Sequence, residues 1–264
     1  MADIEYSVVD QVAWIRLNRP KVKNSFTLEM IDQWAQFLRD AKTDPGVGAI
    51  VVTGSADSFC GGVDLSVMQA MVADDDALAW KNLLWERVHH IAFTLEHLDK
   101  PVIAAVNGTA VGAGMDMSLM CDMRFAARSA RFCESYIRIG AVPGDGGCFF
   151  LPRLVGVAKA LELLLSGEFV GAEEGLRIGL VNRVYDDAEL EAQTQAFARK
   201  LVGHNPLAMR MIKRTVYQSL HMDMRTSLDL ISSHMAVVQT NAKADDALDA
   251  FRAGQRERSP ETKA

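Results

Sequence analysis

The sequence predicts an α/β fold, in which strands and helices alternate, followed by a helical C-terminal region. Two short apolar runs, AIVVTG at residues 49–54 and PVIAAVNG at residues 101–108, are rich in small and β-branched residues and end in turn signals. Such runs are typical of parallel strands that are buried on both faces. Each follows a stretch with apolar residues at helical spacing, which is the order expected of βαβ units.

The N-terminal residues predict two strands and one helix. Residues 4–18 form two apolar segments on either side of Val9-Asp10-Gln11, and the dipeptide Arg19-Pro20 ends the second segment. Thr27 is placed as the N-cap of a helix over residues 28–44, which ends at Pro45-Gly46.

Later segments extend the same pattern. We expect helices over residues 77–98, 117–122 and 189–204, a strand at MRFAA (residues 123–127), and mostly helix from Pro206 to about Arg252. Helical patterns dominate from Lys159 onward. We therefore divide the chain into an α/β core (residues 1–200) and a helical C-terminal region (residues 201–264).

Composition excludes several classes of function. The 264 residues include 28 basic and 34 acidic side chains, giving a net charge of −6, and no basic cluster predicts binding to nucleic acid. No apolar run reaches the roughly 18–20 residues of a membrane span, and no secretory signal is present, so we expect a cytoplasmic protein. The 4 cysteines lack C-x-x-C spacing and are expected to be reduced, packed thiols. The histidines show no metal-ligand spacing, and no metal site is expected.

Three glycine-rich stretches follow predicted strands, where open α/β sheets place ligands. They are SFCGGVDL (residues 58–65), NGTAVGAGMD (residues 107–116) and IGAVPGDGG (residues 139–147). Glycine lets a ligand approach the backbone, and N–H groups at a helix start favour negative charge. Taken singly, each stretch is weak evidence for a ligand site, because a tight turn explains it more simply. No G-x-G-x-x-G or G-K-[ST] motif is present, which argues against dinucleotide and nucleotide-triphosphate loops.

Taken together with LPRLVG (residues 151–156) and AEEGLRIGLVNRV (residues 172–184), these stretches resemble the enoyl-CoA hydratase/isomerase (crotonase) superfamily. The resemblance runs from NRPKVKNSFT (residues 18–27) to about Lys213. It implies a crotonase-type ββα spiral core with a helical C-terminal trimerisation region, an acyl-CoA thioester as substrate without a separate cofactor, and a homotrimer or dimer of trimers.

The resemblance also implies an oxyanion hole formed by the backbone N–H groups of Val63 and Ala113. A thioester enolate concentrates negative charge on one oxygen, and preorganised donors at that oxygen are each worth roughly 3–4 kcal/mol. By the same resemblance, the substrate and its CoA portion are expected to contact Lys23, Gly62, Asp64, Leu65, Gly112 and Gly114.

The acid/base residues depart from the hydratase pattern. Family hydratases use two glutamates, and their positions are held here by Asp116 and Tyr136. A phenol with an ordinary pKa near 10 is a poor general base at neutral pH. Two other acids are near in sequence, Glu134 and Asp145. Asp145 has the offset of the acid in some carbon–carbon-cleaving relatives, whereas family isomerases place it one residue earlier, at Gly144.

We therefore expect Asp145 to be the main acid/base, ahead of Asp116, with Tyr136 and Glu134 as further candidates. Simpler roles stay open: Asp145 as a turn residue, Asp116 as a first-turn helix acid, and Tyr136 as a packed aromatic. The predicted function is an acyl-CoA-processing enzyme of the hydratase/isomerase type. The alternatives are a carbon–carbon bond hydrolase, a catalytically silent acyl-CoA- or protein-binding fold and, because His89 matches a dehalogenase histidine, a dehalogenase.

Overall fold

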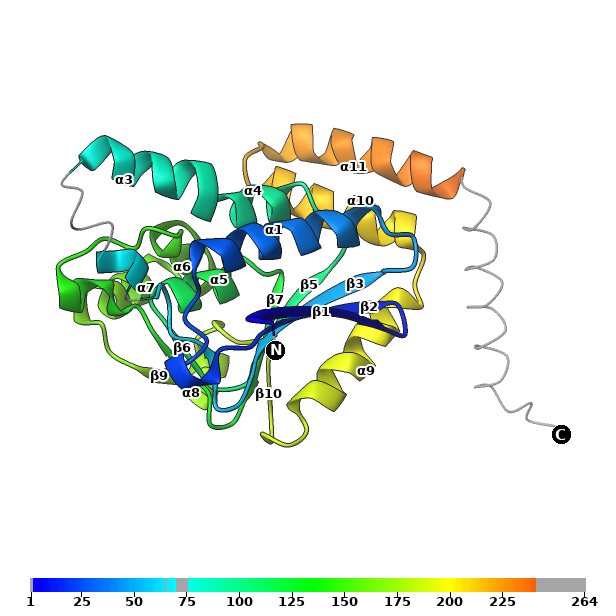
Figure 1. The fold of residues 1–264 in the computed structure, drawn as a ribbon. Helices are drawn as coiled ribbons and strands as arrows, with labels where there is room; N and C mark the ends of the chain where they lie inside the picture. Colours follow the sequence, from blue (N-terminus) through cyan, green and yellow to red (C-terminus); the bar gives the residue numbers. More distant parts are fainter. Residues whose placement is uncertain (1, 65, 70–75, 241–264) are drawn as a thin grey trace, which may run out of the picture.

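The structure, a computed structural model, describes residues 2–64, 66–69 and 76–240. Its strands form a six-stranded sheet in the order β1-β2-β3-β5-β7-β10 and a four-stranded sheet in the order β4-β6-β8-β9. Helices lie on both sides of the larger sheet, and the smaller sheet lies beside it (Figure 1). The mixed α/β fold is the one predicted.

The chain begins with a hairpin of β1 (Ile4–Val9) and β2 (Val12–Leu17). Asp10 and Gln11 form its turn with φ values of 51° and 63°, the left-handed conformations that a two-residue hairpin needs. The predicted pair of strands is confirmed.

Four parallel strands follow β2 in the larger sheet. They are β3 (Ala49–Gly54), β5 (Val102–Val106), β7 (Met123–Ala127) and β10 (Arg183–Tyr185). Every residue of β3 and β5 is buried, as their continuous apolar sequence predicts. The reason is visible in Figure 1, where α1 (Leu28–Thr43) covers one face of the sheet and α9 (Leu190–Val202) the other.

Helix α1 begins and ends where its sequence signals lie. The hydroxyl of Thr27 accepts a hydrogen bond from the Met30 N–H, so the predicted N-cap is confirmed. A short 3₁₀ turn, η1 (Pro20–Val22), precedes the helix, with its proline at the first position. The buried face of α1 packs on the sheet and includes Ile31, Trp34 and Leu38.

The smaller sheet contains three short parallel strands, β4 (Ser58–Cys60), β6 (Thr109–Val111) and β8 (Arg131–Cys133), with β9 (Val170–Gly171) antiparallel to β8. Around it lie α5 (Ala113–Leu119), the 3₁₀ helix η3 (Ser135–Ile139), α6 (Gly147–Val155), α7 (Val157–Ser166) and α8 (Ala172–Arg177).

The helix expected over residues 77–98 is interrupted. It consists of α3 (Ala77–Leu83), a π-helical turn η2 (Leu84–Val88) and α4 (His90–Glu96). The predicted helical stretch is confirmed, but the π turn within it was not predicted, because apolar spacing does not reveal the extra residue that a π turn accommodates. Such turns occur often at functional sites.

The chain described ends with α10 (Pro206–Ser219) and α11 (Met224–Gln239), which pack against each other. They begin at the N-caps Asn205 and Asp223, so the long helical stretch is two helices; its remainder lies outside the described residues. Lys213 of α10 is hydrogen-bonded to Asp122 at 2.7 Å, which ties α10 to the core.

Cys60, Cys121 and Cys133 are buried, whereas Cys148 is exposed, so the expectation of packed thiols is wrong for that residue. Cys148 lies in the first turn of α6, whose outer face is open to solvent. Within the described ranges, no helix is both long and apolar enough to span a membrane.

Candidate active site

Three parallel strands of the smaller sheet end at the same edge, and each leads into one of the predicted site segments. Strand β4 is followed by Gly62 and Val63, β6 by Gly112 and the start of α5, and β8 by Glu134 and η3. Because the strands are parallel, their carboxyl ends converge, which is where α/β sheets place ligands.

Val63 and Ala113, whose backbone N–H groups are the predicted oxyanion-hole donors, lie in neighbouring segments that follow β4 and β6. Phe26 hydrogen-bonds the residues on either side of Val63, from its N–H to the Gly62 carbonyl and from its carbonyl to the Asp64 N–H, both at 2.9 Å. Neither the Val63 nor the Ala113 N–H donates a hydrogen bond to any described residue. Ala113 begins α5, where N–H groups have no intrahelical partner.

Glycines allow the two loops to approach. Gly62 and Gly112 have φ values of 98° and 52°, which favour glycine, and a Cβ on Gly62 would lie 3.7 Å from the Ala113 nitrogen. A Cβ on Gly114 would lie 2.2 Å from the Cys60 carbonyl oxygen, so only glycine fits there. These contacts bring the loop that carries Val63 against the start of α5, where Ala113 lies.

Next to this N–H pair, Tyr136 joins two aspartates. Its hydroxyl lies 2.8 Å from Asp116 Oδ2 and 2.7 Å from Asp145 Oδ2. A Cβ on Gly112 would lie 3.8 Å from the Tyr136 ring, so the phenol is in contact with the loop that carries Ala113. Asp116 and Asp145 are 0% and 3% exposed. The structure therefore brings together three predicted acid/base candidates from α5, η3 and the loop before α6.

Glu134, the fourth candidate, lies on the other side of Asp116. Its side chain is 1% exposed, and neither of its carboxyl oxygens has a hydrogen-bond donor among the described residues. A Cβ on Gly147 would lie 2.6 Å from Asp116 Oδ1 and 3.0 and 3.1 Å from the two Glu134 oxygens. The two carboxyl groups thus meet over Gly147, the first residue of α6, whose importance the sequence reasoning missed.

Burial dominates the electrostatics of this cluster. It raises the pKa of Asp116 to about 7, with a further increase from the charge of Asp145, and it raises the pKa of Glu134 to about 10, assisted by the charge of Asp116. The pKa of Asp145 is also raised by burial, although the Tyr136 hydrogen bond and the charge of His89 oppose this change. Burial raises the pKa of Tyr136 well above 10.

His89 supports the third glycine loop. One of its ring nitrogens, Nε2, lies 2.7 Å from the Gly144 carbonyl oxygen. A carbonyl only accepts, so Nε2 carries the proton. Trp85 and Phe93 pack edge-on against the His89 ring. Sequence spacing predicts a surface or packed histidine here and does not predict this contact with the residue before Asp145.

The remaining predicted contacts lie around the N–H pair. Lys23 forms an exposed ion pair with Asp57 at 2.7 Å. Asp64 accepts hydrogen bonds from Arg19 at 2.8 Å and from Ser66, so its carboxylate is already engaged within the loop. Leu65, also predicted, lies outside the described residues.

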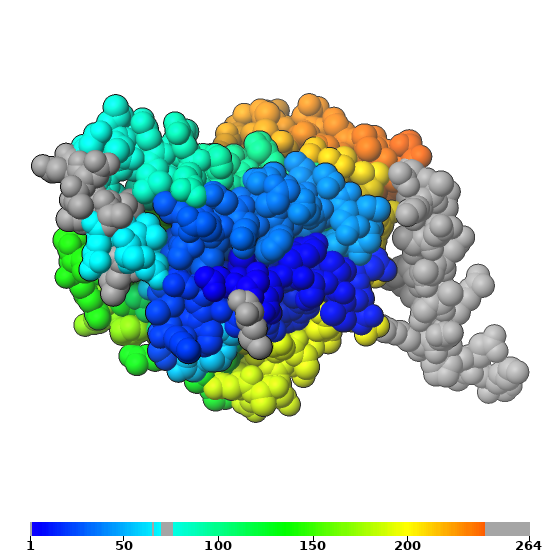
Figure 2. Space-filling model, viewed as in Figure 1, coloured from blue at the N-terminus to red at the C-terminus, as the bar shows by residue number. Residues whose placement is uncertain are grey.

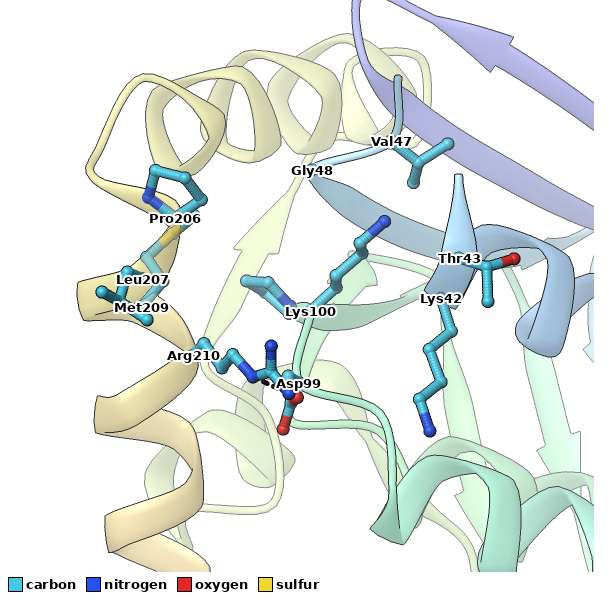
Figure 3. A pocket seen from close by; sticks show the side chains of 11 residues that line it. Lys42, Thr43, Val47, Gly48, Asp99, Lys100, Pro206, Leu207, Met209 and Arg210 are labelled. Carbon is cyan, nitrogen blue, oxygen red and sulfur yellow. Dashed lines mark ion pairs between the residues drawn. The ribbon is translucent and has the colours of Figure 1, made fainter. Parts of the chain in front are cut away.

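No described group of three or more His, Cys, Asp or Glu side chains is arranged to hold a metal ion. A cavity of about 480 Å³ is lined by other residues, at the end of α1, just before β3 and β5, and at the start of α10. Figure 3 shows Lys42, Lys100, Asp99 and Arg210 around it. Asp99 pairs with Arg210, and Lys100 donates to the Ala41 and Asp44 carbonyls. These charged side chains of the cavity are therefore paired with groups of the protein itself.

The chain matches a known protein family over nearly its whole length. The model of the enoyl-CoA hydratase/isomerase family matches residues 8–257. The chain belongs to this family. The enoyl-CoA hydratase/isomerase fold is also found in solved structures: an enoyl-CoA hydratase from Bacillus anthracis matches with a TM-score of 0.87 and 30% identity, covering 96% of this chain and 97% of that one. An enoyl-CoA hydratase/isomerase from Cupriavidus metallidurans CH34 matches with a TM-score of 0.89 and 32% identity, covering 96% and 94%.

Curated relatives in the enoyl-CoA hydratase/isomerase family carry both kinds of activity in their names. The chain is 34% identical to the short-chain-enoyl-CoA hydratase of Clostridium acetobutylicum, over 91% of each chain. It is 33% identical to the 1,2-epoxyphenylacetyl-CoA isomerase of Escherichia coli (strain K12), over 95% of this chain and 94% of that one. The predictions of a crotonase-type fold and of an acyl-CoA-processing enzyme of this type are confirmed.

Proposed function

We propose that the protein moves a proton between two carbons of an enoyl-CoA thioester and thereby isomerises its double bond. The observation that carries the proposal is the hydrogen-bonded set of Asp116, Tyr136 and Asp145 beside the free N–H groups of Val63 and Ala113. An isomerisation requires an acid/base that removes and returns a proton, and donors that stabilise the intervening enolate.

In the proposed reaction, the thioester oxygen accepts hydrogen bonds from the Val63 and Ala113 N–H groups. An ionised aspartate removes a proton from a carbon near the thioester, and the negative charge passes to that oxygen as an enolate. A protonated carboxyl of the same cluster then returns a proton to a different carbon, which moves the double bond. A raised carboxyl pKa suits this role, because the group exchanges protons near neutral pH.

Hydration is the second candidate, because several curated relatives are named as enoyl-CoA hydratases. A hydratase must hold a water molecule and activate it with a base. Here Tyr136 takes the place of the second family glutamate, and its hydroxyl is bonded to both aspartates. A phenol whose pKa is raised well above 10 does not deprotonate water at neutral pH. The site therefore favours isomerisation.

A silent scaffold is disfavoured by the cost of the cluster. Three buried carboxyl groups and a phenol lie together, and groups of this kind reduce stability unless each is paired. A fold that merely binds a partner has no need of them.

The test compares two substrates with one set of variants. The wild-type protein should convert a 3-enoyl-CoA into the conjugated 2-enoyl-CoA, measured by ultraviolet absorbance, much faster than it hydrates crotonyl-CoA. Asp145→Asn and Asp116→Asn should each slow isomerisation by about 10²–10⁴-fold. Asp40→Asn, an exposed residue on α1, is the matched control and should leave the rate unchanged. Faster hydration than isomerisation, or full activity of both site variants, would overturn the proposal.

We further propose that the enzyme assembles as a homotrimer or a dimer of trimers through the region from residue 201. No described residue of α10 or α11 is buried, and their exposed side chains include many apolar ones. Part of this surface is seen at the top of Figure 2. These apolar residues are Ile212, Val216, Leu220, Leu228, Ile231, Met235 and Val237. Apolar surface of this kind is typical of contacts between subunits.

The proposed proton transfers need no redox group, so we propose acyl-CoA as the substrate without a separate cofactor. We propose the cytoplasm as the location.

A further inference from the structure

The hydrogen bonds of Tyr136 determine how many protons it and the two aspartates carry together. The phenol has one proton, yet its oxygen lies within 2.8 Å of carboxyl oxygens from both Asp116 and Asp145. Tyr136 donates to only one of them. The other aspartate can bond to the phenol oxygen only if it carries a proton of its own. One of the two aspartates is therefore protonated whenever both contacts are hydrogen bonds.

Glu134 and Asp116 form a second pair of carboxyl groups that needs a proton. Their oxygens surround the position that a Gly147 Cβ would occupy, at 2.6–3.1 Å, and both side chains are fully buried. Two ionised carboxylates repel each other, whereas a carboxylic acid donates a strong hydrogen bond to a carboxylate. A proton on Glu134 would satisfy Asp116 Oδ1, which otherwise has no described partner.

We propose that Tyr136 is a proton relay between Asp116 and Asp145, and that the cluster of Glu134, Asp116, Tyr136 and Asp145 carries a single negative charge that either aspartate can hold. This inference deepens the proposed isomerisation and rests on it for its role in turnover.

The relay step balances without any other reactant. In one form, Asp145 is protonated and donates to the Tyr136 oxygen, while Tyr136 donates to ionised Asp116. The proton then passes from Asp145 to Tyr136 as the phenol proton passes to Asp116. The result is ionised Asp145 and protonated Asp116. Tyr136 is neutral in both forms, and Glu134 donates to Asp116 throughout.

This exchange suits a double-bond shift in which the proton leaves one carbon and arrives at another. One aspartate accepts a proton from the first carbon, and the other then delivers one to the second carbon of the enolate. The relay then restores the starting form without a proton crossing to solvent. The substrate class that fits is an enoyl thioester whose double bond moves relative to the carbonyl group.

The pKa values of the cluster and the groups around it are consistent with a single negative charge on the cluster. Burial raises the pKa of Glu134 to about 10, so it is protonated at neutral pH, and it raises the pKa of Tyr136 further still. The other titratable groups that influence the cluster are His89, whose charge favours ionised Asp145, the thiol of Cys148 near Glu134, and buried Cys60. The cluster also lies at the N-termini of α5 and α6, and the Gly147 N–H favours ionised Asp116.

The first test is an infrared difference spectrum of the unliganded enzyme at neutral pH. We expect wild type to show the carbonyl bands of two protonated buried carboxyl groups, one from Glu134 and one shared by the aspartates. Asp116→Asn and Asp145→Asn should each leave one band, because the remaining aspartate is then ionised. A different wild-type count, or loss of a band in only one variant, would overturn the relay. This measurement needs no substrate, so it stands or fails independently of the proposed activity.

The second test is a double-mutant cycle on the isomerisation rate. Tyr136→Phe should lower kcat at least about 100-fold, as expected for loss of a proton-transfer group. Combined with Asp145→Asn it should cause no further loss, because both changes interrupt the same relay. Multiplying losses, or a pH profile unchanged by Tyr136→Phe, would show that the phenol acts only by packing. Tyr185→Phe, on β10, is the matched control and should keep wild-type activity, and circular dichroism should show each variant folded.

Discussion

Replacing Glu134 with glutamine should change how the stability of the protein depends on pH. Burial raises the Glu134 pKa from an ordinary 4.5 to about 10 in the folded protein. The folded protein thus keeps a proton that the unfolded chain releases above about pH 4.5. Stabilisation from this group is fully present below pH 4.5 and is lost as the pH rises toward 10. Glutamine is neutral in both states and has no such dependence.

The expected change in unfolding free energy follows from the one proton that the folded protein holds on Glu134. Each pH unit between the two pKa values costs the wild-type protein about 1.4 kcal/mol of unfolding free energy. From about pH 5.5 to about pH 8.5, Glu134→Gln should therefore gain about 4 kcal/mol relative to wild type. The change in local packing adds a constant offset and does not alter this slope.

Urea denaturation at a fixed protein concentration, repeated at each pH, measures this difference. Glu96→Gln, an exposed residue at the end of α4, is the matched control and should follow the wild-type curve at every pH. If the Glu134→Gln and wild-type curves run parallel across this range, Glu134 is ionised in the folded protein and the proton count of the cluster is wrong.

Three further predictions test the site and the assembly. Because the pKa of Asp116 is about 7, kcat/KM should fall about tenfold per pH unit below that value, as measured by isomerisation assays across pH; a flat profile down to about pH 5 would contradict this. Gly114→Ala should destabilise the protein by at least about 3 kcal/mol in urea denaturation, since its Cβ would lie 2.2 Å from a carbonyl oxygen, whereas Gly171→Ala has open space and should be neutral. Leu228→Glu on α11, 52% exposed, should lower the mass measured by sedimentation toward that of a monomer; an unchanged mass would place the contact elsewhere.

Much of the fold could be predicted because its signals are local. The apolar run at β3 and the Thr27 cap each depend on a few neighbouring residues. The π turn at Leu84–Val88 could not be predicted, because its apolar spacing resembles that of a regular helix.

Part of the candidate site could likewise be predicted from the sequence, and part could not. The glycine-rich loops before Val63 and Ala113 are visible in the sequence, and the resemblance to the family then implies that the N–H groups of these two residues are the donors. The joining of Asp116 to Asp145 by one phenol is not visible in the sequence, because it depends on where η3 and α6 pack. Tyr136 was predicted as a weak replacement for a glutamate, whereas its position suggests a proton donor and acceptor between two acids.

On the proposed mechanism, the oxyanion hole and the acid cluster act as one electrostatic unit. Before reaction, the single negative charge lies on an aspartate, where the N-termini of α5 and α6 favour it. When that aspartate takes the substrate proton, the cluster becomes neutral and the charge passes to the enolate oxygen at Val63 and Ala113. The buried site holds one negative charge before and after the transfer, so no new charge is taken out of water. A second ionised carboxylate would raise the energy of the enolate by repulsion in this low-dielectric interior. Protonation of Glu134 and of one aspartate is therefore what makes a site with three carboxyl groups compatible with an anionic intermediate.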